Sequence, residues 1–200
     1  MKWLDRILEN ETVYRLWQAS YAEAKLDPIR RHNELSAARS VLDVGCGPGT
    51  NTRHFSGAEY VGLDVNPRYT EYARRRWGRE FMTVDAVDYR PPAGRTFDFI
   101  LLNSFLHHID TPGVERILGR LPALLAPGGH VHVLDLVLPE RRGLARALAR
   151  LDRGEHPRPL EEWRRLFSRF LRPVVFEPYP LKTLGATLWQ MVYFKGAQPA

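Results

Sequence analysis

Residues 41–55 read VLDVGCGPGTNTRHF, and this stretch decides the fold of the chain. Its first four residues are typical of a short buried strand, and the glycines that alternate from Gly45 to Gly49 predict a tight turn. Either Thr50 or Asn51 is a candidate cap for a short helix that follows. Glycine has no Cβ and tolerates positive φ, and the first N–H groups of a helix are unpaired. The stretch therefore predicts a strand, a loop and a helix start that bind a ligand against bare backbone.

The spacing of the glycines separates two kinds of ligand. A dinucleotide loop has the spacing G-x-G-x-x-G, which would put its third small residue at Thr50, whereas the third glycine here is Gly49. Asp43 precedes the loop, and its carboxylate would repel a pyrophosphate but attract an ammonium or sulfonium group. S-adenosylmethionine carries both cations, so the loop favours this ligand over NAD. Taken alone, the glycines can also form an ordinary tight turn.

Two further predicted strands end in acids. Residues 60–65 contain Asp64, 19 positions after Gly45, close to the spacing of about 20 expected of a carboxylate that binds a ribose hydroxyl pair. Residues 81–84 are followed by Asp85, which is placed to accept the exocyclic amine of an adenine. Acids also close strands simply as turn formers, and this alternative stays open for each of them.

Five segments between residues 38 and 138 follow one another in a recognisable order: VLDVGCGPGT, GLDVNP, FMTVDAVDY, FDFILLNSFLHHID and LLAPGGHVHVLDLV. In this order they resemble the motifs of class I S-adenosylmethionine-dependent methyltransferases of the small-molecule type. The resemblance implies a Rossmann-like, mostly parallel seven-stranded α/β sheet with helices on both faces. It also implies cofactor contacts from Asp43, Gly45, Cys46, Gly47, Gly49, Asp64, Val65, Asp85, Ala86, Asn103 and Ser104.

The length and composition suit one domain. Two hundred residues that are 44% hydrophobic and 26% charged can bury a substantial core. We expect a helical N-terminal arm at 1–38, a cofactor-binding core at 39–138, a helical insertion after strand five at 139–173, and closing antiparallel strands at 174–196. Strands that alternate with helices predict a parallel sheet covered on both faces.

The N-terminal arm is expected to form two helices, at 3–10 and 12–26, with Pro28 ending the second or starting a third short turn. In methyltransferases of the family that the chain resembles, such an arm covers the cofactor and part of the substrate pocket. Tyr14, Trp17 and Tyr21 share one helix face, which either packs the arm on the sheet or walls the acceptor site. Candidates to hold the cofactor carboxylate are Lys25, Arg31 and Asn33.

Beyond the glycine loop, we expect a helix at 68–77, strands at 97–102 and 130–136, helices at 142–153 and 160–171, and an antiparallel strand pair at 174–179 and 187–194.

The predicted fourth strand is followed by His107 and His108, at the sheet edge where ligands bind in such folds. A histidine titrates near neutrality and can remove a proton from an acceptor. Asp135, near the end of the fifth strand, is placed to orient the histidine or to contact the acceptor. A surface or helix-capping role for the histidines and a turn role for Asp135 remain alternatives, and transfer by proximity alone would need no base.

The sequence lacks the residues that other classes of methyl-transfer reaction require. Asn103 is followed by Ser-Phe-Leu rather than by the Pro-Pro-aromatic run of enzymes that methylate nucleobase amines. Cys46 is the only cysteine, so no thiol is available near strand four for a cytosine-C5 mechanism, and neither an intrachain disulfide nor a cysteine zinc cluster can form. We interpret Cys46 as a small loop residue. Asp110 stands alone where a metal-dependent enzyme would cluster carboxylates, so we expect no metal.

The net charge of +6 and the pI near 9.7 come from arginine. Residues 139–173 contain ten arginines against five acids, which is either a solvated helix face or a region that attracts an anionic acceptor. The sequence disfavours nucleic acid as a partner, because no lysine-aromatic interleaving and no appended binding module are visible. No run approaches 20 apolar residues and the first residues are charged, so we expect neither a membrane span nor a secretory signal. We therefore expect a cytoplasmic protein. We expect it to be a monomer or a homodimer.

These patterns predict a methyltransferase that moves a methyl group from S-adenosylmethionine to an oxygen or nitrogen of a small metabolite and leaves S-adenosylhomocysteine. Three alternatives remain: an RNA or protein methyltransferase, a non-catalytic S-adenosylmethionine-binding module, and a nucleotide-binding oxidoreductase, which Asp43 and the loop spacing disfavour.

Overall fold

The computed structural model describes residues 23–151, 155–183 and 185–199. The chain divides into two compact units, residues 1–33 and 34–200, and each is described by itself. In the first unit, α3 (Asp27–His32) has Pro28 in its first turn, where a missing N–H costs nothing, so this proline starts a short helix. The aromatic stripe predicted at Tyr14, Trp17 and Tyr21 lies outside the described residues. The roles predicted for Lys25, Arg31 and Asn33 remain predictions.

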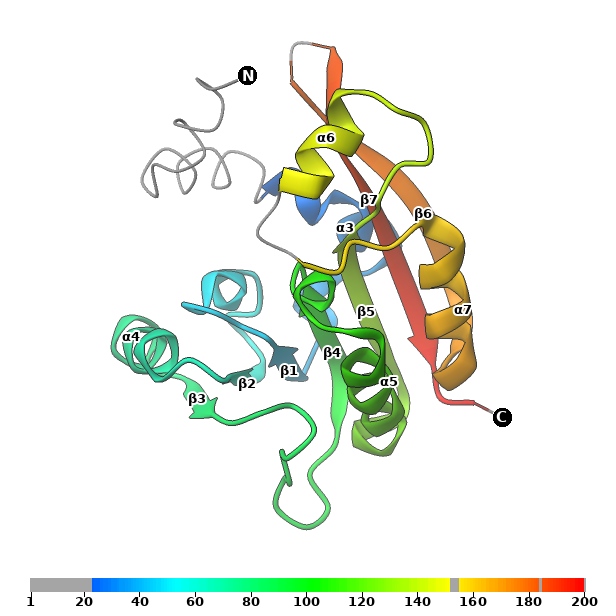
Figure 1. The fold of residues 1–200 in the computed structure, drawn as a ribbon. Coiled ribbons are helices and arrows are strands. Elements are labelled where there is room, and N and C mark those ends of the chain that lie inside the picture. Colours follow the sequence, from blue (N-terminus) through cyan, green and yellow to red (C-terminus); the bar gives the residue numbers. More distant parts are fainter. Residues whose placement is uncertain (1–22, 152–154, 184, 200) are drawn as a thin grey trace. The chain divides into compact units, whose positions relative to one another are not determined.

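The second unit is built on a seven-stranded sheet with the strand order β3-β2-β1-β4-β5-β7-β6 (Figure 1). Strands β1 to β5 pair in parallel, and β7 lies antiparallel between β5 and β6. This arrangement confirms the predicted α/β sheet and its antiparallel closing pair. The strands are β1 (Ser40–Val44), β2 (Glu59–Asp64), β3 (Glu80–Thr83), β4 (Phe97–Asn103), β5 (Leu125–Leu136), β6 (Arg172–Thr183) and β7 (Ala186–Ala197).

Helices cover both faces of this sheet. Their bounds are α4 (Pro67–Trp77), α5 (Thr111–Arg120), α6 (Leu144–Leu151) and α7 (Leu160–Phe170), with 3-10 turns η1 (Leu35–Ala37), η2 (Thr50–His54), η3 (Leu106–His108) and η4 (Leu121–Leu124). Side-chain caps explain where two of these helices begin. Asn66 is the N-cap of α4 and accepts from the N–H of Arg68 at 3.0 Å, and Asp110 is the N-cap of α5 and accepts from the N–H of Gly113 at 2.9 Å.

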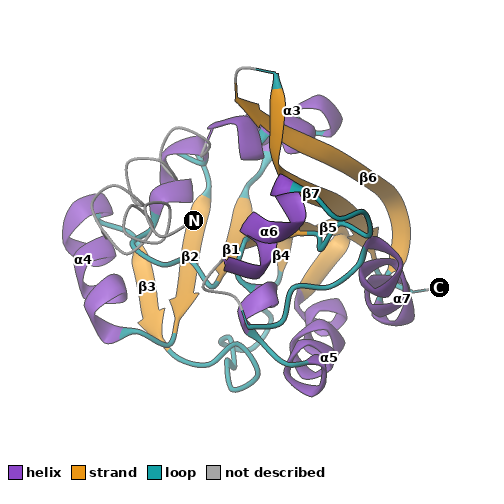
Figure 2. Cartoon of the chain, turned by 45° about the horizontal axis from the view of Figure 1, so that its top comes forward, coloured by secondary structure: helices purple, strands orange, loops and turns teal. Residues whose placement is uncertain are grey.

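The main core lies on one face of the sheet, where α5 and α7 pack side by side (Figures 1 and 2). Because side chains alternate along a strand, Leu42 and Val44 point to this face while Asp43 between them points to the other. Trp163 and Phe167 of α7 are fully buried in the core. On the opposite face, Thr70 of α4 lies 2.6 Å from Thr83 of β3, hydroxyl to hydroxyl.

The segment after the glycine loop differs from its prediction. The expected capped helix is the 3-10 turn η2, whose N-cap is Gly49 and which has no side-chain cap hydrogen bond, so the prediction that Thr50 or Asn51 caps it is wrong. The amide of Asn51 instead donates to Asp43 at 3.0 Å. The polar side chain of Asn51 does not cap this turn, because a buried carboxylate nearby has the greater need of a donor.

Candidate active site

The glycine loop joins β1 to η2 with a backbone that only glycine adopts easily. Gly45, Gly47 and Gly49 have φ of +71°, +53° and +76°. A Cβ on Gly45 would come within 2.6 Å of the Phe105 ring, and a Cβ on Gly49 within 2.8 Å of Phe81, whereas one on Gly47 would meet nothing within 4 Å. The first and third glycines are therefore required by both conformation and space, and Gly47 by conformation alone.

Asp64, at the end of β2, fixes this loop. One carboxylate oxygen accepts from the N–H of Gly47 at 2.8 Å, and the other accepts from the N–H of Asn66 at 2.8 Å. The N–H groups of Gly45 and Cys46 both donate to the carbonyl of Leu63, each at 2.9 Å. The loop is thus attached to the end of the neighbouring strand by side chain and backbone together.

Asp43 is fully buried beneath the loop. Its Oδ2 accepts from the hydroxyl of Tyr60 and from the amide of Asn51, while its Oδ1 is buried with no partner among the described residues. Burial raises the pKa of Asp43 to about 6, against these two hydrogen bonds, which lower it. Such an unpartnered buried oxygen is an acceptor that an ammonium group could satisfy.

A line of polar contacts runs from this carboxylate to the turn after β4. Asn103 donates from its amide to Asn51 Oδ1 at 3.1 Å, and the hydroxyl of Ser104 donates to Asn103 Oδ1 at 3.1 Å. Ser104 has φ of +58°, and its N–H donates to the carbonyl of Leu134 at 2.7 Å. The side chains of Asn103 and Ser104, predicted as cofactor contacts, therefore support the loop in this structure. Sequence reasoning missed Asn51 and Tyr60 as parts of this network, because their partner is adjacent only across the sheet.

A cavity of about 340 Å³ opens at the carboxyl ends of β1, β2 and β3. It brings together five of the predicted cofactor residues, namely Gly45, Asp64, Val65, Asp85 and Ala86. Among the described residues, its lining includes neither Asp43, Cys46, Gly47 and Gly49 nor Asn103 and Ser104. Sequence reasoning missed the rest of its lining, which is Val44, Leu63, Val84, Val87, Phe105, Ile109, Gly113, Arg116 and Ile117.

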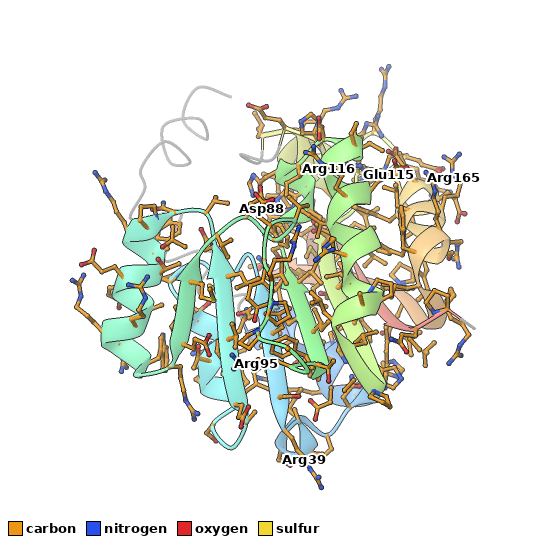
Figure 3. The ribbon with its side chains drawn as sticks, turned by 90° about the horizontal axis from the view of Figure 1, so that it is seen from below. Arg39, Asp88, Arg95, Glu115, Arg116 and Arg165 are labelled. Carbon is orange, nitrogen blue, oxygen red and sulfur yellow. The ribbon has the colours of Figure 1, made fainter. Side chains whose placement is uncertain are left out.

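The cavity-lining residues that the sequence did not predict come mostly from the turn after β4 and from α5. Arg116 is exposed on α5, and Figure 3 shows it on that helix and Asp88 on the loop after β3. No motif marked Arg116, because its place on the cavity depends on how α5 packs. The cavity suits an adenosine group: Val65 and Ile109 are apolar neighbours for a base, and two carboxylates are available to a ribose and an amine. Asp85 is exposed and accepts from the N–H of Val87 at 3.0 Å.

Cys46 is buried inside the loop. Burial, and then the nearby carboxylates of Asp43 and Asp64, raise the pKa of its thiol well above the usual range. A buried thiol that stays neutral is a poor nucleophile, which agrees with the interpretation of Cys46 as a small loop residue.

The second cluster is formed by His107 and Asp135. His107 Nδ1 lies 2.6 Å from Asp135 Oδ1, and both side chains are buried. Asp135 also accepts from the N–H of Leu106 at 2.9 Å and from its neighbour Leu136 at 2.7 Å. The two histidines lie on η3, a single 3-10 turn that leaves His107 buried and His108 exposed, with ring centroids 4.2 Å apart. In the described part of the chain, neither ring lines the 340 Å³ cavity.

The region expected to attract an anion contains arginines with different surroundings. Arg142, Arg146 and Arg150 line a hollow of about 350 Å³ along α6. Arg158 is instead buried and donates to backbone carbonyls. Within the described ranges, no group of three His, Cys, Asp or Glu side chains is arranged to hold a metal ion. None of the described helices is long and apolar enough to cross a membrane.

Comparison with known proteins agrees with this geometry. Residues 41–129 match the family described as methyltransferase domain. The trans-aconitate 2-methyltransferase of Paracidovorax citrulli is 37% identical over 113 residues, which are 54% of this chain and 42% of that protein. The enzyme of the same name from Methylobacterium radiotolerans is 40% identical over 111 residues, 53% of this chain and 40% of that protein. The chain spans less than half the length of these two curated relatives.

Solved structures share the fold at low identity. A methyltransferase from Methanosarcina mazei, described as S-adenosylmethionine-dependent, superposes with a TM-score of 0.69 at 20% identity and covers 86% of this chain and 98% of its own. Human N-acetylserotonin methyltransferase, solved with S-adenosylmethionine, gives a TM-score of 0.66 at 20% identity, with 97% of this chain and 58% of that chain covered. In fold and in sequence, the chain is similar to class I S-adenosylmethionine-dependent methyltransferases. The similarity to the methyltransferase-domain family lies in residues 41–129, which are less than half of the chain.

Proposed function

We propose that this protein transfers the methyl group of S-adenosylmethionine to an oxygen or nitrogen atom of a small metabolite. The observation that carries the proposal is the cavity at the ends of three adjacent parallel strands, with Gly45, Asp64 and Asp85 each supplied by a different strand end. Ligands of open α/β sheets bind at this edge. Two relatives named as trans-aconitate 2-methyltransferases are 37% and 40% identical to this chain over 113 and 111 residues.

Each group around the cavity has a separate part in holding the cofactor. Asp64 would accept the ribose hydroxyls, since this residue lines the cavity at the end of β2. Asp85 and Ala86 would meet the adenine, and the glycine loop would receive the methionyl part. The buried Oδ1 of Asp43 provides negative charge under the loop for a cationic group. When bound, the cofactor supplies an electrophilic methyl group on a sulfonium sulfur.

His107 is the proposed base for a hydroxyl or amine acceptor. If Nδ1–H donates to Asp135, the basic lone pair lies on Nε2, and the carboxylate stabilises the imidazolium that forms when this nitrogen takes a proton. His108, exposed beside it, is the alternative base. A carboxylate acceptor has no proton to lose at neutral pH, so transfer to it would depend on alignment alone.

We further propose that the acceptor is anionic. The relatives are named for trans-aconitate, a polycarboxylate. In this chain, the hollow along α6 is lined by three arginines, and guanidinium groups suit carboxylates because their donors form a planar fork. The chain from Leu136 to α6 also leaves β5 at the edge that carries the glycine loop. A cytoplasmic location and a monomer or homodimer complete the proposal.

Calorimetry with S-adenosylmethionine, followed by measurement of S-adenosylhomocysteine release, tests the function. We expect micromolar binding and acceptor-dependent release with trans-aconitate or another small polycarboxylate, and lower acceptor affinity in Arg146→Gln than in the control Arg165→Gln. Absence of cofactor binding would refute the proposal. Binding without release from any carboxylate, hydroxyl or amine acceptor would instead support a non-catalytic module, and salt-sensitive RNA binding with turnover would support an RNA methyltransferase.

A further inference from the structure

The loop before α7 is fastened to the turn that carries His107. The N–H of His156 donates to the carbonyl of His107 at 2.9 Å. The guanidinium of Arg158 donates to the carbonyl of Leu106 at 3.2 Å and to the carbonyl of Ile109 at 2.7 Å. Three carbonyls of one short turn therefore accept from two residues that lie about 50 positions later in the chain.

Arg158 is itself held firmly. Its side chain is buried, its guanidinium also donates to the hydroxyl of Thr111 at 3.2 Å and lies over the Trp163 ring, and its Nε is 3.4 Å from the carboxylate of Glu162. The backbone of Arg158 pairs with Val137, directly after β5, and its carbonyl accepts from the N–H of Leu138 at 2.8 Å. A buried guanidinium is costly unless its donors are satisfied, and here they satisfy the backbone of the His107 turn.

The turn that carries His107 is thus hydrogen-bonded on two sides, by Asp135 and by Arg158. Asp135, inside β5, binds Leu106 N–H and His107 Nδ1. Arg158, beside the end of the same strand, binds the carbonyls on either side of the histidines. A single-turn 3-10 helix has few hydrogen bonds of its own, so its orientation depends on such external contacts.

We propose that Arg158 is a positioning residue for methyl transfer: it fixes the turn 105–109 and thereby the imidazole of His107, although it does not itself touch the acceptor. The inference rests on the proposed function of His107. It also gives the arginine-rich segment a role beyond its charge, because this arginine acts through the geometry of its donors. Lysine can replace it only in part, since one ammonium lacks the planar fork that spans two carbonyls.

The test uses Arg158→Ala and rescue by free guanidinium. In wild type, a downfield imidazole proton from His107 Nδ1–H should be visible by NMR, assigned by its absence in His107→Gln. We expect Arg158→Ala to stay folded, to lose or broaden this signal, and to have kcat lowered about 10- to 100-fold, the cost of a misplaced catalytic group. About 5 mM guanidinium, far below denaturing concentration, should restore both signal and kcat, whereas neutral urea should restore neither.

Arg165→Ala is the matched control, because Arg165 is exposed on α7 (Figure 3) and the same loss of charge there should change neither readout. Arg158→Lys should recover kcat only partly. A folded Arg158→Ala protein with the His107 signal and kcat of wild type would overturn the proposal, as would losses that guanidinium leaves unchanged. Failure of the wild type to turn over any acceptor would count against the proposed function, while the NMR signal would still test the positioning by Arg158.

Discussion

His107 Nδ1 and Asp135 Oδ1 are 2.6 Å apart although the residues are separated by 28 positions, and both side chains are buried. The two parallel strands β4 and β5 bring them together, because Asn103 pairs with Leu134 and the next residues of both strands reach the same edge. The turn after β4 therefore presents a histidine whose ring orientation is fixed by a carboxylate.

Replacing His107 with Ala should lower turnover on a hydroxyl or amine acceptor by roughly 10²- to 10⁴-fold, the usual value of general-base catalysis. The affinity for S-adenosylmethionine should stay within about threefold, and the acidic limb of the pH profile should disappear. His108→Ala is the control and should retain most activity, since its ring is exposed. Near-full activity of both variants on such an acceptor would show that transfer proceeds by proximity alone.

Asp135→Asn should destabilise the protein by about 1 to 3 kcal/mol, the cost of unsatisfied buried groups. Asp135 accepts from three donors through its two oxygens, whereas an amide offers one oxygen and turns its own NH₂ toward an N–H. Urea denaturation of the variant and of Asp88→Asn, an exposed control, gives the comparison. Equal stabilities would contradict this account of the Asp135 contacts.

Asp64→Ala should weaken binding of S-adenosylmethionine by about 1.5 to 3 kcal/mol, the range for hydrogen bonds to a charged group. The same change removes the acceptors of Gly47 and Asn66 N–H, so the melting temperature should fall as well. Calorimetry on the folded variant separates the two effects. An unchanged dissociation constant would exclude Asp64 as the ribose ligand.

Substitutions in the glycine loop should follow the space around each glycine. Gly49→Ala combines a strained positive φ with contacts of 2.8 and 2.9 Å to Phe81 and Trp77, so we expect a loss of about 2 to 4 kcal/mol in unfolding free energy. Gly47→Ala meets no neighbour and should lose only about 1 to 2 kcal/mol. Gly47→Val should fold but no longer bind the cofactor. If chemical denaturation gave equal losses for the two Ala variants, the packing argument would fail.

Asp43 should make stability depend on pH between about 4 and 6. Its folded pKa of about 6 lies above the ordinary 3.8, so the folded protein holds the proton more tightly than the unfolded chain. The resulting stabilisation is fully present below about pH 4, is lost as the pH rises through 6, and amounts to about 3 kcal/mol. Denaturation curves at several pH values should show this slope in wild type and lack it in Asp43→Asn.

The strands and the two acids of the cavity were predictable because their signals are local. The apolar runs around Val41, Val61 and Ile100 mark strands by composition, and Asp64 and Asp85 lie at fixed distances along the sequence from the glycine loop. The positive φ of Gly45 and Gly49 likewise follows from a tight turn that any other residue would strain.

The places and contacts of Asn51, Arg116 and Arg158 depend on tertiary structure. Asn51 looked like a helix cap, and only the packing of η2 beneath β1 places its amide on Asp43. Arg158 was one of ten similar arginines in its segment, and nothing within the sequence separates it from an exposed one such as Arg165. Local sequence determined the elements and the loop, because backbone preference and side-chain alternation act over a few residues. The partners of buried polar groups were decided only by the fold, because a desolvated charge binds whichever donor or acceptor the packing brings within reach.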